Sequence, residues 1–135
     1  MNIDNICPVS EALDFFQRKW ILCIITDMFN GCKHFTDFQQ ANPDLSNNVL
    51  SQSLKYMEDM ELIEKHHIDA KTRNKTEYAL TEKGLKVNKI LYELTLFSLT
   101  ELDASKLNKQ TKQALLDKYT KILNIDTELV NIDSN

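Results

Sequence analysis

Residues 46–57, Ser-Asn-Asn-Val-Leu-Ser-Gln-Ser-Leu-Lys-Tyr-Met, decide the fold of this chain. They predict an amphipathic helix for which Ser46 is the N-cap. One face of the predicted helix is apolar and carries Val49, Leu50, Leu54, Met57 and, just beyond this stretch, Met60. The other face is polar and carries Asn47, Asn48, Ser51, Gln52 and Lys55. We expect the first face to join a core and the second to face outward.

Three helical segments are predicted before this one. Pro8 suits the first turn of a helix that continues to Phe16 with apolar residues at helical spacing. Residues 19–30 are apolar on nearly every side, which predicts a helix buried all round and ended by Gly31. Thr36 is the predicted N-cap of a short helix through Ala41, and Asn-Pro-Asp at 42–44 supplies a turn. The chain therefore contains a helix-turn-helix.

A hairpin and two more helical segments are predicted after it. Residues 62–68 and 75–80 are rich in β-branched or aromatic side chains and predict two strands, with residues 69–74 as the tip. Beyond Thr81, a predicted N-cap, helical spacing continues over Val87, Ile90, Leu91, Leu94, Phe97 and Leu102. A last amphipathic helix carries Leu115, Leu116, Tyr119, Ile122 and Leu123. We predict one mainly α domain over residues 1–135 with a small β-hairpin.

Composition excludes several classes of protein. The chain has 135 residues, of which 42% are hydrophobic, with 16 basic and 20 acidic side chains and a net charge of −4. This mixture is typical of a globular domain and excludes intrinsic disorder. Two Gly and two Pro are too few for a turn-dense β-sandwich or a phosphate-binding loop. The N-terminus carries no secretory signal, so we expect a cytoplasmic protein.

Positive charge is concentrated in one part of this acidic chain. Between residues 65 and 89 there are seven Lys or Arg residues against three acidic ones. Taken alone, the run is more typical of a solvated, lysine-rich surface than of a binding site. It follows, however, a helix that offers Asn, Gln and Ser side chains, which can bond base edges in the major groove. The combination favours DNA, with contacts expected from Ser46, Asn47, Asn48, Ser51, Gln52, Lys55, Lys71, Arg73 and Lys75.

An ordered set of short motifs carries a family resemblance. The set is Cys7-Pro8, Lys19-Trp20, Phe35-x-x-Phe38, Leu45-Ser46, Val49-Leu50-Ser51-Gln52-x-Leu54 and Glu77-Tyr78-Ala79-Leu80-Thr81-x-x-Gly84. Over residues 7–100 the chain resembles the HxlR-type winged-helix transcriptional regulators of the MarR-like superfamily. It departs from the family pattern at Glu61, where glycine is usual, at Ser53, where arginine is frequent, and in lacking a proline before the second wing strand.

The resemblance implies a homodimer of winged helices on a palindromic operator. The helix after Ser46 would enter the major groove, and the wing, about residues 62–80, would contact the DNA backbone or minor groove. The N-terminal helix and the C-terminal helices, about residues 82–124, would form the dimer. Leu91, Leu94, Phe97, Leu115, Tyr119 and Ile122 are the apolar residues that we expect the dimer to cover. A repressor is the expected activity.

The three cysteines differ in their surroundings. Cys7 precedes Pro8 at a helix start, which favours a thiolate, and Arg18 and Lys19 are expected nearby. Cys23 lies in an apolar helix and is expected to be inert, while Cys32 follows Gly31 and is expected at the surface as a second candidate. In the resembling family a Cys-Pro thiol senses quinones, aldehydes or oxidants, which makes Cys7 the leading sensor. A buried structural thiol is the alternative.

Catalytic motifs are missing from the sequence. It contains no G-x-S-x-G, H-E-x-x-H or C-x-x-C motif, so we expect no enzymatic activity, no metal and no cofactor. Two other functions stay open on the same scaffold. One is a protein-interaction module that does not bind DNA, and the other is a regulator that responds to a non-covalent ligand.

Overall fold

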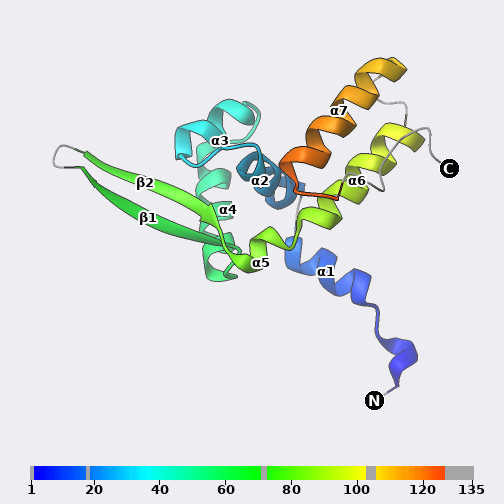
Figure 1. Ribbon diagram of the computed structural model, residues 1–135. Coiled ribbons are helices and arrows are strands. Elements are labelled where there is room, and N and C mark those ends of the chain that lie inside the picture. The colour runs from blue at the N-terminus through cyan, green and yellow to red at the C-terminus, as the bar shows by residue number, and fades with distance from the viewer. Residues whose placement is uncertain (1, 18, 71–72, 103–105, 127–135) are drawn as a thin grey trace.

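The computed structural model describes residues 2–17, 19–70, 73–102 and 106–126, of which residues 68–70 and 73–75 are described in their backbone only. In chain order the elements are η1 (Ile3–Asn5), α1 (Pro8–Phe16), α2 (Lys19–Phe29), α3 (Phe35–Ala41), α4 (Asn47–Asp59), β1 (Ile63–Ala70), β2 (Arg73–Leu80), α5 (Glu82–Leu85), α6 (Asn88–Glu101) and α7 (Lys109–Ile122) (Figure 1). The predicted fold class, mainly α with a β-hairpin, is confirmed.

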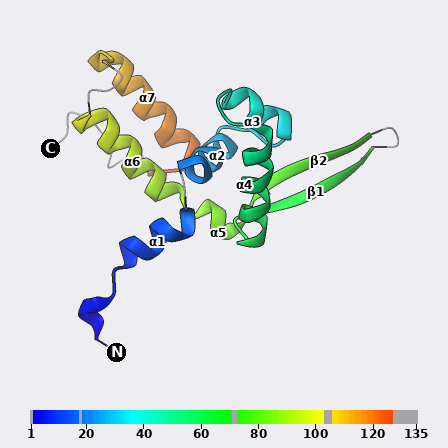
Figure 2. The ribbon, with the colours of Figure 1, turned by 180° about the vertical axis from the view of Figure 1, so that it is seen from behind.

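The elements extend in three directions from a small central core (Figures 1 and 2). The antiparallel hairpin projects away on one side, and α6 and α7 pack against each other on the opposite side. The helix α1 and the short helix η1 before it extend away from the core. Within the described residues, no helix has the length and apolar character that crossing a membrane requires.

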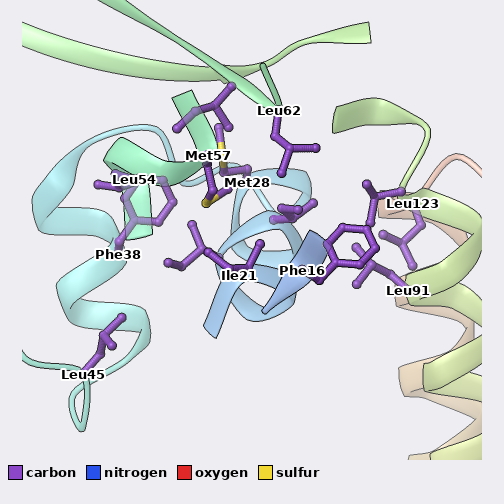
Figure 3. Packing of buried hydrophobic residues seen from close by; sticks show 14 of the residues in the cluster. Phe16, Ile21, Met28, Phe38, Leu45, Leu54, Met57, Leu62, Leu91 and Leu123 are labelled. Atoms are coloured by element: carbon purple, nitrogen blue, oxygen red, sulfur yellow. The ribbon is translucent and has the colours of Figure 1, made fainter. Parts of the chain in front are cut away.

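The apolar face of α4 lies in the core, as predicted. Leu50, Leu54 and Met57 are buried against Phe38 of α3 and the buried face of α2 (Figure 3). Val49 and Met60 are half-buried at the edges of this face. The residues of α2 that complete the cluster are Ile21, Ile24, Ile25 and Met28.

The prediction that α2 is buried all round is wrong. Trp20, Leu22 and Cys23 are only half-buried, because the few elements of this small domain pack mainly against the opposite face of α2. The end of α2 was predicted correctly: Gly31 follows it with φ of 100°, a left-handed conformation that glycine adopts without strain.

The predicted N-cap of α3, Thr36, is also wrong. The helix begins at Phe35, and His34 is the N-cap. The carboxylate of Asp37 accepts hydrogen bonds from the backbone N–H of Lys33 (3.0 Å) and of His34 (2.9 Å), so the helix starts two residues earlier than predicted. These hydrogen bonds lower the pKa of Asp37.

The hairpin is longer than predicted. Strand pairing runs from Ile63↔Leu80 to Ala70↔Arg73, so residues 69, 70, 73 and 74 are paired strand and not tip. Backbone hydrogen bonds form whatever the side chains are, and hydrophobic alternation therefore underestimates a hairpin that projects from the core. At its base, Glu61 has φ of 62°, the left-handed region that favours glycine, where the resembling regulators usually carry glycine.

The segment after the hairpin forms two helices. Thr81 caps α5, its Oγ1 accepting the Gly84 N–H at 3.1 Å, and α6 begins afresh at Asn88. Leu91 is buried inside the subunit, which corrects its place in the predicted dimer surface. The last-helix residues of that surface, Leu115, Tyr119 and Ile122, are half-buried against the subunit's own core, because α6 and α7 pack together. Leu94 and Phe97 are exposed.

Gly84 allows α5 to approach the base of the hairpin. A Cβ atom at this position would lie 2.2 Å from the carbonyl oxygen of Leu62, so either the helix or the strand would have to move. We expect Gly84→Ala to lower the free energy of unfolding by about 1–3 kcal/mol, measured by denaturant titration. Lys86→Ala, at an exposed position just after α5, should change it by less than about 0.5 kcal/mol. Equal stability of the two variants would contradict this account of the close approach.

Candidate nucleic-acid interface

The outward face of α4 is polar and unobstructed. The side chains of Asn47, Asn48, Ser51, Gln52 and Lys55 are all exposed, as the sequence predicted. Ser46 is the N-cap, and its Oγ accepts the N–H of Val49 at 3.1 Å. This capping bond occupies the hydroxyl as an acceptor and leaves its O–H free to donate. Each predicted residue of this helix therefore lies on one surface.

Lys55 differs from its neighbours because it has acidic partners. Its Nζ lies 3.1 Å from Asp59 and 4.0 Å from Glu58, and the hydrogen bond to Asp59 raises the pKa of Lys55. Exposed pairs of this kind add little stability and are readily exchanged for another anion. Lys55 keeps its positive charge, and its three N–H donors allow it to bond a further anion beside Asp59.

The hairpin leaves the body next to α4 and projects beyond it (Figure 2). Of the basic residues predicted on it, Arg73 and Lys75 lie on β2, while Lys71 lies outside the described residues. The structure thus places the hairpin, whose strand β2 includes Arg73 and Lys75, beside α4.

The base of the hairpin is bonded to the helix-turn-helix. The N–H of Tyr78 donates to the carbonyl of Lys33 at 2.8 Å. The Nδ1 of His34 lies 3.2 Å from the carbonyl oxygen of Thr76, and its Nε2 lies 3.6 Å from Glu77, which also pairs with Lys33 at 3.7 Å. Sequence reasoning missed this role of His34, because the pairing partner is 42 residues away. The hairpin and the helix-turn-helix are positioned as one unit.

A second set of contacts joins α1 to α4. The hydroxyl of Tyr56, on α4, donates to the carbonyl of Phe15 near the end of α1. Lys83 spans the same junction, with its Nζ 4.8 Å from the centre of the Phe15 ring and donating to the carbonyl of Met60 at 2.9 Å. Gln17 turns the chain between α1 and α2 with φ of 59°, a strained conformation for a residue with a side chain.

The basic side chains between residues 65 and 89 have different surroundings. Lys83 is exposed and contacts the α1–α4 junction through the Phe15 ring and the Met60 carbonyl. Lys65, Lys86 and Lys89 are exposed. The basic run therefore includes one side chain that contacts the α1–α4 junction and three others that are exposed.

The three cysteines are free and differ in exposure. Cys7 is exposed and is the N-cap of α1, with its Sγ accepting the N–H of Ser10 at 3.4 Å. Burial is the main cause that raises the pKa of the half-buried Cys23. Cys32 was expected at the surface but is also half-buried, and burial followed by the nearby Asp27 and Asp37 raises its pKa. Cys32 is therefore a poor second thiol.

The surroundings predicted for Cys7 are only partly described. Arg18 lies outside the described residues. Lys19 places its Nζ 4.7 Å from the centre of the Trp20 ring. As for metal ligands, the described part of the chain groups no three His, Cys, Asp or Glu side chains suitably for an ion.

Comparison with known proteins agrees with this architecture. The chain belongs to the HxlR-like helix-turn-helix family, which it matches over residues 15–106. It is 34% identical to the uncharacterized HTH-type transcriptional regulator YvaP of Bacillus subtilis over 106 residues, covering 78% of this chain and 97% of YvaP. It is therefore a transcriptional regulator with a helix-turn-helix.

Solved structures of redox regulators are among its structural relatives. The oxidized form of the redox regulator HypR is 26% identical, with a TM-score of 0.63, covering 68% of this chain and 94% of HypR. The reduced form of YodB from Bacillus subtilis has a TM-score of 0.63 and 24% identity, covering 76% of this chain and 99% of YodB, a likeness of fold alone.

Proposed function

We propose that this regulator is a repressor that binds a palindromic operator as a homodimer, with α4 in the major groove and the hairpin against the DNA backbone. The observation that carries the proposal is the exposed polar face of α4. Asn and Gln side chains can bond adenine through two hydrogen bonds, and Ser can bond several base edges. Asn48, Ser51 and Gln52 present these groups from one side of the helix.

The distribution of charge supports the same orientation. The net charge of −4 opposes non-specific attraction to phosphates. The basic residues of the hairpin and the exposed Lys65 and Lys86 supply local attraction. Such an arrangement holds the protein on DNA by one surface.

Exposed apolar side chains support the homodimer. On α1, Val9 is 68% and Leu13 is 62% exposed, and on α6 Leu94 is 52% and Phe97 is 58% exposed. A second copy of the chain would remove these side chains from water. Two reading helices spaced about one DNA turn, roughly 34 Å, then match the two halves of a palindrome.

Cys7 is the proposed sensor because it is the exposed cysteine. Addition of its sulfur to a quinone ring carbon forms a carbon–sulfur bond, and the ring keeps the electrons and takes up protons to become a hydroquinone. Diamide oxidation instead joins two thiols in a disulfide, and its N=N bond is reduced to a hydrazine. Similar structures include the redox regulator HypR in its oxidized form and diamide-treated YodB, which supports a thiol-based response in this chain.

The contacts of α1 offer a route from Cys7 to the DNA. Modification of Sγ removes the acceptor for the Ser10 N–H at the start of α1. At its other end, α1 is bonded to the reading helix through Phe15 and Tyr56. A displacement of α1 would therefore move α4 or the partner subunit, and loss of half-site spacing releases the operator.

The first test separates base contacts from backbone contacts. Asn48→Ala or Gln52→Ala should cost about 1–3 kcal/mol on the preferred duplex and little on a scrambled one, because base contacts carry specificity. Replacing Lys71 and Arg73 together by Ala should weaken binding to both duplexes and flatten the salt dependence. Fluorescence anisotropy on a duplex selected from a random pool measures both effects. Failure to select any duplex would favour the protein-interaction module.

The dimer is tested by mass in solution. Sedimentation equilibrium at micromolar concentration should give twice the mass of one chain, and replacing Leu94 and Phe97 by Ser should shift the protein toward monomer because it removes exposed apolar area. Ala79→Ser changes an exposed residue of β2, outside the N-terminal and C-terminal helices expected to form the dimer, and serves as the control. A monomeric parent protein would rule out the palindromic operator.

The sensor is tested by release from DNA. Cys7→Ser should bind the selected duplex like the parent protein and remain bound after quinone or diamide treatment, since the reactive sulfur is gone. Cys23→Ser and Cys32→Ser, measured in parallel, should still be released. Equal release of Cys7→Ser and the parent would place the sensor elsewhere, and an inducer that acts without any cysteine would indicate a non-covalent ligand.

A further inference from the structure

One hydrogen bond joins the two helices of the helix-turn-helix at their outer surface. Gln39, on α3, donates from Nε2 to the Oδ1 of Asn47 at 2.6 Å. Gln39 is half-buried and Asn47 is exposed at the first position of α4. The Asn47 amide is thus held by a partner from another helix.

This bond determines which end of the Asn47 amide is available. The Oδ1 atom accepts from Gln39, which holds the amide in one orientation, and both protons of Nδ2 stay available to a partner. Bidentate recognition of adenine would require Oδ1 to accept a second hydrogen bond while Gln39 holds it, whereas a contact through Nδ2 alone leaves the Gln39 bond intact. The backbone N–H groups of the first helical turn lie beside Asn47 and add further donors.

Asn48 and Gln52 differ from Asn47 in this respect. No side chain among the described residues hydrogen-bonds the amide of either one, so both keep donor and acceptor for a base edge. An amide at the start of the helix whose oxygen is held by Gln39 and whose N–H groups are free suits a phosphate oxygen. Phosphate oxygens accept hydrogen bonds and are present at every base pair.

We propose that Gln39 is a positioning residue that holds Asn47 as a hydrogen-bond donor to a phosphate oxygen of the operator. Asn47 then sets how deeply α4 sits in the groove, while Asn48 and Gln52 read bases. The inference rests on the proposed orientation of α4 toward DNA. A neutral amide releases no counterion, so this contact contributes affinity without contributing to the salt slope.

The test uses anisotropy on the selected duplex and on a scrambled duplex of equal length. Asn47→Ala should weaken binding to both by about tenfold, the value of one hydrogen bond to a charged oxygen, and should leave the salt slope unchanged. A loss confined to the selected duplex would mean that Asn47 reads a base and would overturn the proposal. An unchanged affinity on both duplexes would overturn it as well.

Double substitution tests the role of Gln39. Gln39→Ala should weaken binding to both duplexes by about threefold in the parent and cause no further loss in Asn47→Ala, because the two residues act through one contact. Additive losses would show that Gln39 acts independently. Melting temperatures are measured for every variant, and a loss of binding that follows a fall in melting temperature would assign the bond to folding alone.

Reversing the bond provides a sharper comparison. In Gln39→Glu the carboxylate can only accept, so Asn47 must donate to it and turn its Oδ1 toward the phosphate. Gln40→Glu adds the same charge at the neighbouring exposed position and is the matched control. We expect Gln39→Glu to lose more affinity than Gln40→Glu, and equal losses would overturn the proposal. If Asn48→Ala and Gln52→Ala also lack a cognate-specific effect, the orientation of α4 is wrong, a failure of the proposed function itself.

Discussion

Burial of the apolar face of α4 is the constraint on which the rest of the structure depends. Leu50, Leu54 and Met57 pack against α2 and α3, and each such side chain contributes about 1.5–3 kcal/mol when it is fully buried. Successive residues of a helix are turned by about 100°, so rotation by one position would bury Ser51 or Lys55 in place of leucine. The packing therefore fixes which side chains α4 presents outward, and the polar surface that we propose to contact DNA follows from the core.

The helix α1 is attached to this core mainly at one end. Phe16 is buried and Phe15 contacts Tyr56 and Lys83, whereas Val9 and Leu13 remain exposed. Cys7 lies at the opposite end, where it caps the helix with its own sulfur. One end of α1 is thus bonded to α4, and the other end carries the exposed thiol that we propose as the sensor.

Much of the fold and part of the site follow from the sequence. The helices, the cap at Ser46 and the polar face of α4 depend on spacing and on local hydrogen bonds, which a sequence records directly. Strand ends and the break after α5 were placed less well, because they depend on backbone pairing and on the approach of Gly84 to Leu62. The roles proposed for Gln39, Tyr56 and His34 were not predicted, since each depends on a partner in another element.

The sequence by itself determined that α4 has one apolar and one polar face and that a cysteine begins α1, because helical periodicity and capping act over a few residues. Only the tertiary structure decided that Cys32 is half-buried, that Lys83 turns toward Phe15, and that Leu91 belongs to the core. Burial and pairing depend on which elements meet in space. Residues far apart in the chain supply those neighbours, and no local pattern specifies them.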